Sequence, residues 1–113
     1  LYTYDTFDAI KDNPEVSVVY IVTPNGTHAD LAIRAMEAGK HVMVEKVMAT
    51  SSQDAMRMVR TARRLNRKLM VAYRARFEPF NQQVIRMARE AEFGRITSIV
   101  AHKGFAIAGA FGK

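Results

Sequence analysis

Val-Ser-Val-Val-Tyr-Ile-Val-Thr-Pro-Asn-Gly, residues 16–26, is the stretch that decides the fold. Residues 16–22 are nearly all apolar and mostly β-branched, which is typical of a strand that is buried on both faces. Parallel sheets need strands of this kind, because helices cover both of their sides. We therefore predict a strand over 16–22 in a parallel sheet, with a polar turn directly after it.

Elements of the same two kinds alternate along the rest of the chain. Apolar runs predict further strands over 41–44, 68–73 and 96–103. Apolar residues at helical spacing, together with capping residues, predict helices over 5–12, 27–39, 51–65 and 79–94. Alternation of this kind predicts an α/β fold in which right-handed helical crossovers join parallel strands.

Polar and reactive residues follow three of these strands at the point where each strand ends. They are Thr23, Pro24 and Asn25 after the first strand, Glu45 and Lys46 after the second, and Tyr73 and Arg74 after the third. In an open parallel sheet, ligands bind in the crevice beyond the carboxyl ends of the strands. The sequence therefore predicts a binding site along this edge.

The turn from Thr23 to His28 joins a strand to the start of a helix. A helix amino terminus offers unpaired N–H groups, so this loop could contact the ribose or phosphate of a nucleotide. An ordinary strand-to-helix turn is the alternative. We expect His28 to contact a ligand because it lies near Asn25, and capping or packing at the helix start is its alternative. His41, at the start of a strand, is expected to be structural.

Glu45 and Lys46 are the most specific candidates for catalytic residues in the sequence. The ammonium of Lys46 could donate a proton or a hydrogen bond to a substrate oxygen. Glu45 could hold the lysine in place or hydrogen-bond a ligand amide. The alternative is an exposed ion pair, which contributes roughly 0–1 kcal/mol.

Tyr73 and Arg74 offer a second kind of contact. The aromatic face of Tyr73 could stack against a ligand ring, and the guanidinium of Arg74 could bind an anion. A solvated loop is the alternative.

The net charge of +6 raises the question of a nucleic-acid partner. Arg57, Arg60, Arg64 and Arg67 fall on one stripe of a predicted helix, and such a stripe can bind phosphates. However, that helix has no interleaved aromatic residues to stack bases, and no helix-turn-helix or zinc-finger spacing is present. We therefore expect a solvated outer face and no nucleic-acid partner.

Composition excludes several other classes. The chain has 113 residues, enough for one modest domain, and no cysteine, which excludes disulfides and thiolate metal sites. No cluster of metal ligands is present, so we expect no metal. No run approaches the ~18 consecutive apolar residues that a membrane helix needs, so we expect no membrane partner.

Taken together, four motifs resemble the Gfo/Idh/MocA family of oxidoreductases, and most of all its glucose–fructose oxidoreductase branch. They are Val-Val-Tyr-Ile-Val-Thr-Pro-Asn-Gly-Thr-His-Ala (18–29), Ala-Gly-Lys-His-Val-Met-Val-Glu-Lys (38–46), Met-Ala-Thr-Ser (48–51) and Lys-Leu-Met-Val-Ala-Tyr-Arg (68–74). A fifth segment, Phe-Glu-Pro-Phe-Asn (77–81), looks like an aromatic-acid-proline segment of the branch. The likeness runs to about Phe105.

The resemblance implies an enzyme that holds NADP or NAD on a Rossmann fold and acts on sugars or polyols. By residue matching, Lys46 is the catalytic lysine beside the nicotinamide, and Glu45 contacts the nicotinamide side of the cofactor. The other expected cofactor contacts are Thr23, Pro24, Asn25, His28, Tyr73 and Arg74. The family usually has proline after Glu-Lys, whereas this chain has Val47, which loosens the aim of the lysine.

The resemblance also predicts how the chain is organised. Residues 1–75 would be the second half of the Rossmann domain, and 76–113 the start of an α/β domain for substrate and oligomer contacts. The Gly-x-Gly-x-x-Gly fingerprint would then lie upstream of Leu1. We expect a fragment that is inactive alone, from a homodimer or homotetramer of the cytoplasm or the bacterial periplasm. A non-catalytic binding or structural module with a decayed nucleotide site is the alternative.

Overall fold

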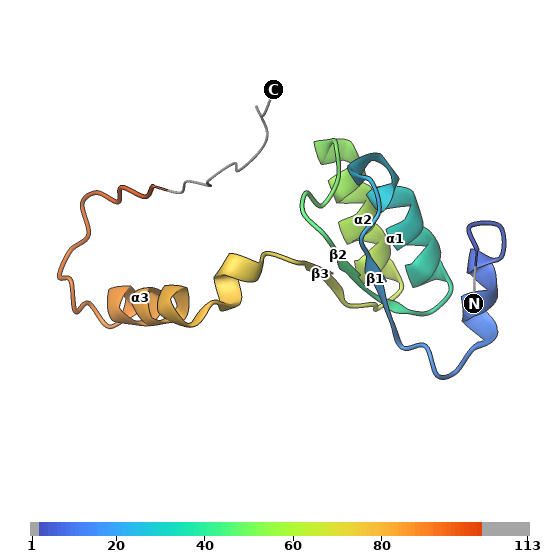
Figure 1. The fold of residues 1–113 in the computed structure, drawn as a ribbon, viewed down its shortest axis with the longest axis horizontal. Coiled ribbons are helices and arrows are strands. Elements are labelled where there is room, and N and C mark those ends of the chain that lie inside the picture. Colours follow the sequence, from blue (N-terminus) through green and yellow to red (C-terminus); the bar gives the residue numbers. More distant parts are fainter. Residues whose placement is uncertain (1–2, 103–113) are drawn as a thin grey trace, which may run out of the picture. The chain divides into compact units, whose positions relative to one another are not determined.

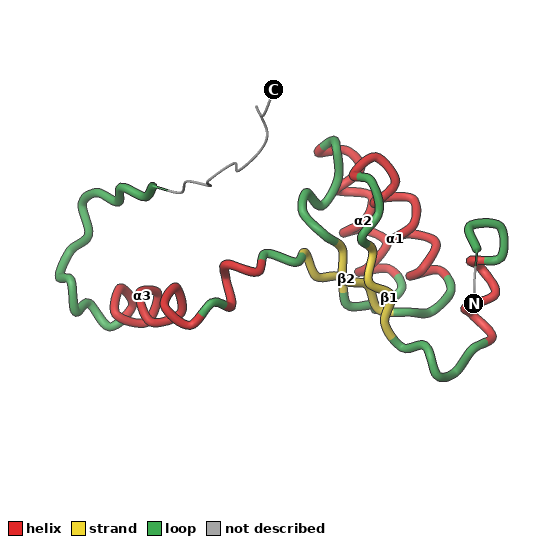
Figure 2. The backbone as a smooth tube through the Cα atoms, viewed as in Figure 1, coloured by secondary structure: helices red, strands yellow, loops and turns green. Residues whose placement is uncertain are grey.

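The computed structural model describes residues 3–102, and within them three strands form one parallel sheet. β1 (Val18–Ile21), β2 (His41–Val44) and β3 (Leu69–Val71) lie in the order β1-β2-β3. The helices are α1 (His28–Glu37), α2 (Ser52–Arg64) and α3 (Pro79–Arg89), with short 3-10 helices η1 (Phe7–Asp12), η2 (Asn25–Thr27) and η3 (Arg74–Phe77). Figures 1 and 2 show how helices and strands alternate along the chain. The predicted parallel α/β fold is confirmed.

The core lies between the sheet and the helix pair α1 and α2, which lie side by side in Figure 1. Ala32, Ala35 and Met36 of α1 and Met58 of α2 are buried there. Val44 of β2 is also fully buried, next to these helices in the same apolar cluster. These helical positions recur at three- and four-residue spacing, so each helix turns one apolar stripe toward the sheet.

The prediction that the first strand is buried on both faces is wrong. Ile21 of β1 is buried, but Val18 and Tyr20, which point to the opposite face, are 53% and 48% exposed. Side chains alternate between the two faces of a strand, and among the described residues α1 and α2 cover only one face of this sheet. The apolar composition of the strand fits a sheet that is covered on both faces. The described chain supplies helices for one face only.

The ends of α2 and α1 follow their predicted signals. The Ser51 hydroxyl accepts a hydrogen bond from the Asp54 N–H at 3.1 Å, which caps the amino end of α2. Gly39 has φ +79° after α1, a backbone conformation that favours glycine at the end of a helix. The predicted helix over 5–12 is instead the 3-10 helix η1, which starts at Phe7.

The chain divides into two compact units, Leu1–Ala75 and Arg76–Lys113. The first contains the sheet with α1 and α2, and the second contains α3. The strand predicted over 96–103 is not formed by residues 96–102, and Lys103 lies outside the described residues. A strand needs a paired neighbour to satisfy its backbone groups, and residues 76–102 contain no other strand with which it could pair. The assignment of these units to two enzyme domains stays a prediction.

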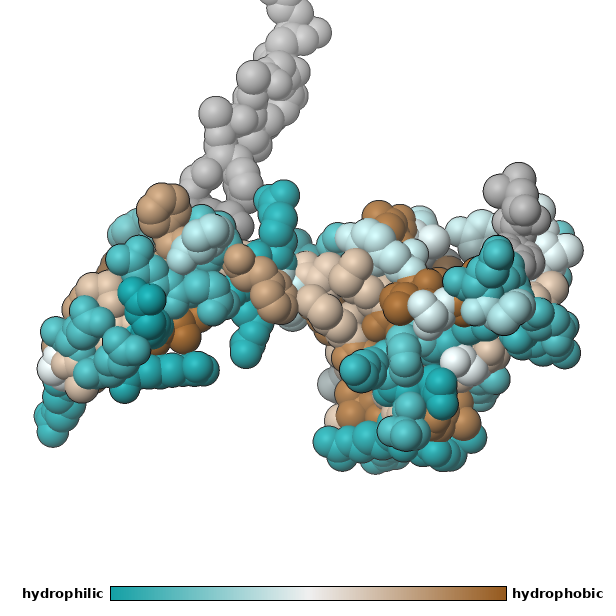
Figure 3. Space-filling view, turned by 90° about the horizontal axis from the view of Figure 1, so that it is seen from below, coloured by the Kyte–Doolittle hydropathy of each residue, from teal (hydrophilic) through white to brown (hydrophobic). Residues whose placement is uncertain are grey.

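Apolar side chains reach the surface of both units, as Figure 3 shows in brown. Val22 and Met70 are exposed in the first unit, and Phe80 and Val84 in the second. None of the helices within residues 3–102 has the length and apolarity that crossing a membrane requires.

Candidate functional site

The three loops that carry the predicted site residues leave the sheet at the same edge. Ile21 of β1 pairs with Val44 of β2, and Val44 pairs with Val71 of β3. Beyond this row, the Glu45 N–H donates to the Ile21 carbonyl and the Ala72 N–H donates to the Val44 carbonyl, both at 2.9 Å. The register therefore brings the ends of the three strands together, as their order in the sequence predicts.

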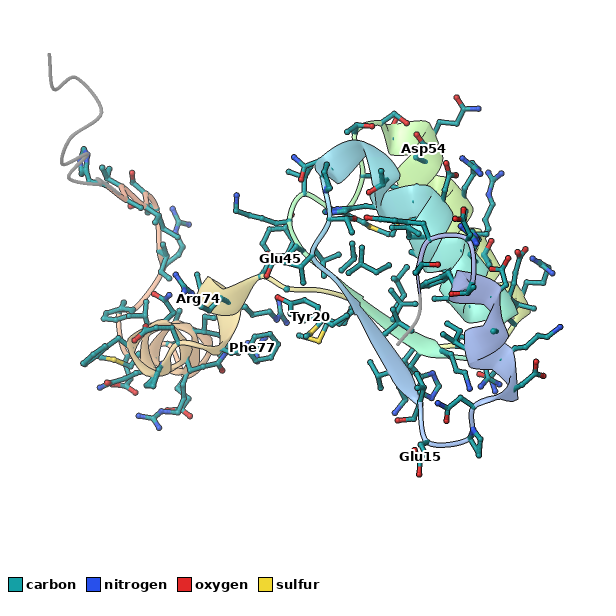
Figure 4. The ribbon with its side chains drawn as sticks, turned by 45° about the vertical axis from the view of Figure 1, so that its right-hand side comes forward. Glu15, Tyr20, Glu45, Asp54, Arg74 and Phe77 are labelled. Atoms are coloured by element: carbon teal, nitrogen blue, oxygen red, sulfur yellow. The ribbon has the colours of Figure 1, made fainter. Side chains whose placement is uncertain are left out.

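Glu45 is held at this edge through both of its carboxylate oxygens. The Tyr20 hydroxyl donates to Oε1, and the backbone N–H of Lys46 donates to Oε2 at 3.2 Å. Figure 4 shows the Tyr20 and Glu45 side chains next to each other. The pKa of Glu45 is lowered, and the hydrogen bond from Tyr20 is the largest cause. The hydrogen bond from the Lys46 amide and the charges of Lys46 and Arg74 lower this pKa further, whereas desolvation raises it. The Tyr20–Glu45 bond raises the pKa of Tyr20, so Tyr20 keeps its proton as the donor, and the lowered pKa of Glu45 favours the carboxylate as the acceptor.

Tyr20 is the residue that sequence reasoning did not place in the site. Its register partner on β2 is Met43, and Glu45 follows Met43 by two residues, so Tyr20 and Glu45 lie on the same face of the sheet. The signal was a hydroxyl-bearing aromatic residue inside an otherwise aliphatic strand. Only the register of β1 against β2 shows which residue that hydroxyl reaches.

We predict that Tyr20→Phe raises the pKa of Glu45 toward its usual value, because it removes the main donor to the carboxylate. A lowered folded-state pKa means that the ionised form stabilises the fold above the unfolded pKa, and that this contribution is lost as pH falls through the folded pKa. A nuclear magnetic resonance titration of the Glu45 carboxyl carbon measures the change. Tyr4→Phe, which leaves the Tyr20–Glu45 bond intact, is the control. An unchanged or lower pKa in Tyr20→Phe contradicts the prediction.

Lys46 follows Glu45 directly, and its side chain is exposed. Its Nζ forms no salt bridge with any residue in the described range 3–102, although its charge still contributes to the lowered pKa of Glu45. The alternative of a simple Glu45–Lys46 ion pair is therefore not what the structure shows. The ammonium is left accessible at the edge of the sheet. The peptide bond after it, to Val47, is cis.

His28 is fully buried at the first position of α1. Its Nδ1 lies 2.7 Å from the Val47 carbonyl oxygen, and its Nε2 lies 2.9 Å from the Thr23 carbonyl oxygen. Both nitrogens face main-chain carbonyls and the ring has no exposed surface, whereas the expected contact with a cofactor stays a prediction. The packing alternative describes its geometry.

The turn after β1 is closed by its own hydroxyl groups. The Thr27 hydroxyl donates to the Pro24 carbonyl at 2.8 Å, so the Thr23 hydroxyl, 2.7 Å away, is the donor to Thr27. Asn25 and Gly26 are exposed at the tip in η2. A Cβ added at Gly26 would meet no atom within 4 Å, so the turn is open on its outer side.

Tyr73 and Arg74 follow β3 at the same edge. Tyr73 is 54% exposed, so an aromatic side chain lies at the surface here. Arg74 lies near enough to Glu45 for its charge to lower the pKa of that carboxyl. The loop after β3 therefore adds an aromatic side chain and a positive charge to the edge.

Three of the four arginines in the predicted stripe, Arg57, Arg64 and Arg67, contact neighbouring segments. Arg57 pairs with Asp54 at 2.7 Å and with Asp30 of α1 at 3.3 Å, and Arg64 lies 3.6 Å from Glu37 of α1. Arg67 donates to the Gly39 carbonyl at 3.0 Å. Most guanidinium groups of the stripe that suggested nucleic-acid binding therefore contact carboxylates or a carbonyl within the fold.

Comparison with known proteins shows which family this chain resembles. The family model of GFO_IDH_MocA, described as "Oxidoreductase family, NAD-binding Rossmann fold", matches residues 1–73. Levoglucosan dehydrogenase of Pseudarthrobacter phenanthrenivorans is 38% identical over 90 residues, which are 80% of this chain and 23% of the relative.

Two solved structures share the fold. Aldose-aldose oxidoreductase from Caulobacter crescentus has a TM-score of 0.77 and 46% identity over 80% of this chain and 27% of its own. The WlbA dehydrogenase from Bordetella pertussis, in complex with NADH and UDP-GlcNAcA, has a TM-score of 0.73 and 28% identity over 84% of this chain and 27% of its own. The chain thus spans about a quarter of the length of these relatives.

Proposed function

Because the chain belongs to the Gfo/Idh/MocA oxidoreductase family, whose Rossmann fold binds NAD, we propose that it forms the catalytic edge of an enzyme that transfers hydride between NADP or NAD and a sugar or polyol. Two relatives support a sugar substrate: one is named levoglucosan dehydrogenase and the other aldose-aldose oxidoreductase. The NADH in the WlbA complex supports a nicotinamide cofactor. The proposal concerns the whole protein, of which this chain supplies the strand-end loops described above.

The exposed groups at the sheet edge fit a nicotinamide nucleotide. The turn at Asn25 and Gly26 is exposed and open at its tip, where a ribose or a phosphate would approach, and Tyr73 is an exposed aromatic side chain. The Glu45 carboxylate can accept a hydrogen bond from the nicotinamide amide, and Arg74 offers a positive charge to an anionic group. When bound, the nicotinamide ring supplies the acceptor or donor of the hydride.

Lys46 supplies the group that moves the proton. Oxidation of an alcohol removes a hydride from carbon and a proton from oxygen, and Lys46 Nζ in its amine form accepts that proton. In the reverse direction its ammonium donates a proton to the carbonyl oxygen. The observation that carries this role is the exposed Lys46 at the strand edge, whose Nζ forms no salt bridge with the described residues. The neighbouring Glu45 carboxylate is hydrogen-bonded to Tyr20.

We predict that the intact protein that carries this chain reduces NADP or NAD with an aldose, an anhydrosugar or a polyol. The measurement is the near-ultraviolet absorbance of the reduced cofactor, with a panel of these substrates and each cofactor in turn. A 2-hydroxy acid without a sugar skeleton serves as the control substrate. Absence of reduced cofactor with every sugar and polyol, in a protein that is folded, contradicts the proposed function.

A further inference from the structure

Two loops of the candidate site are joined through a single buried side chain. His28 is 0% exposed, and its ring lies between the Thr23 carbonyl, after β1, and the Val47 carbonyl, after Lys46. We propose that His28 is a positioning residue, which fixes the loop of Lys46 by hydrogen bonding to Val47 and ties that loop to the turn after β1. The inference rests on the proposed role of Lys46 and deepens it.

The loop of Lys46 is held on both sides of the lysine. Before it, the Glu45 N–H donates to the Ile21 carbonyl at 2.9 Å, and the Lys46 N–H donates to the Glu45 carboxylate at 3.2 Å. After it, the Val47 carbonyl oxygen lies 2.7 Å from His28 Nδ1 and accepts a hydrogen bond when that nitrogen carries the proton. Since Glu45 is anchored by the sheet and by Tyr20, the His28 bond is the anchor on the other side of Lys46.

This anchor matters because the Lys46 side chain has no anchor of its own. Its Nζ makes no salt bridge with the described residues, so the main chain on either side sets the direction from which it reaches a substrate. A misplacement of about 1 Å in a reacting group can cost on the order of 10²-fold in rate. A loosened Val47 is therefore expected to lower turnover while the lysine itself is unchanged.

The two nitrogens of His28 are not equivalent in this role. Both facing oxygens can only accept, so a ring with one N–H donates to one of the two carbonyls at a time, whereas a ring with two N–H groups donates to both. The Nδ1 contact is the one beside Lys46, whereas the Nε2 contact holds the turn after β1. Asparagine places its amide nitrogen near the Nδ1 position, and glutamine places its own near the Nε2 position. The two amides therefore test the two contacts separately.

The experiment compares His28→Asn, His28→Gln and His28→Ala in the intact protein. We expect His28→Asn to keep kcat within about fivefold, and His28→Gln and His28→Ala to lower it by roughly 10- to 100-fold, the range that misplacement of a reacting group produces. The dissociation constant of NADP or NAD should change little in all three. In the cofactor-free protein, amide hydrogen exchange over residues 45–49 should rise in the Gln and Ala variants and stay near wild type in the Asn variant.

His41→Gln is the matched control. His41 accepts a hydrogen bond from the Lys68 N–H at 3.1 Å near the amino ends of β2 and β3, away from the lysine loop. The His41→Gln substitution should leave both kcat and the amide exchange of residues 45–49 unchanged.

Two results would overturn the inference. One is wild-type kcat and exchange in both His28→Gln and His28→Ala; the other is an Asn variant as impaired as the Ala variant, because a merely space-filling ring would give that pattern. If the wild-type protein turns over no sugar, the proposed function fails, and hydrogen exchange in the cofactor-free protein still decides whether His28 holds the loop. If His28→Ala does not fold, the comparison of Asn with Gln carries the test.

Discussion

Lys46→Met in the intact protein is expected to lower kcat by about 10²–10⁴-fold, the range that general acid–base catalysis contributes. Methionine keeps the length and most of the apolar volume of the side chain but cannot exchange a proton. The dissociation constant of the cofactor should stay close to wild type, because the Glu45 and Lys46 main-chain contacts do not involve Nζ. Steady-state turnover with the best sugar, and cofactor titration followed by fluorescence, measure the two quantities.

Lys68→Met is the control for this substitution. Lys68 is exposed and lies directly before β3, at the opposite end of the strand from Tyr73. Its loss should leave kcat unchanged. Turnover of the Lys46 variant within about threefold of wild type, where a catalytic proton transfer should contribute at least ~10²-fold, would remove Lys46 from the mechanism.

The second large effect is expected in the core of the first unit. Met58→Ala should destabilise the sheet and its helices by about 2–5 kcal/mol, the cost of deleting most of a buried methionine side chain. Met58 has no exposed surface and belongs to the cluster that includes Val44, the residue directly before Glu45. Native-state hydrogen exchange of the α2 amides measures the free energy of opening without requiring two-state unfolding of the whole protein.

Met56→Ala provides a control on the same helix. Met56 lies two residues before Met58 and is 49% exposed, so its truncation should change the same free energy by no more than about 0.5 kcal/mol. Equal effects at the two positions would mean that the helix does not bury the face that the structure assigns to it.

The edge that carries the candidate site could be predicted from the sequence, because parallel strands end at a common edge. The runs before Thr23, Glu45 and Tyr73 identified the three strands, and their alternation with helices implied that they are parallel. The motif resemblance pointed to the family that the comparisons then showed for residues 1–73.

The contacts within the site could not be predicted in the same way. The Tyr20–Glu45 bond depends on the register of β1 against β2, which strand composition does not determine. The burial of His28 had a signal, since it continues the helical spacing of Leu31, Ala32 and Ala35, all of them buried in α1. That spacing places His28 on the inner face of the helix, whereas its nearness in sequence to Asn25 suggested the outer one.

Two of the errors in the fold, those in the first and the last predicted strands, have one physical origin. A β-branched stretch shows that a strand can be buried or paired, but the partners come from elsewhere in the structure. The described helices α1 and α2 cover only one face of β1, and residues 76–102 of the second unit contain no strand with which 96–102 could pair. Both predictions assumed partners that these parts of the chain do not supply.

The most direct test of the account is hydrogen-exchange mass spectrometry of the intact protein with and without NADP and NAD. The account predicts slower amide exchange over residues 23–28 and 45–48 when cofactor is bound, with little change over α2, residues 52–64. Protection of α2 without protection of the strand-end loops would contradict it, because the nucleotide would then bind at the arginine stripe and not beside Lys46.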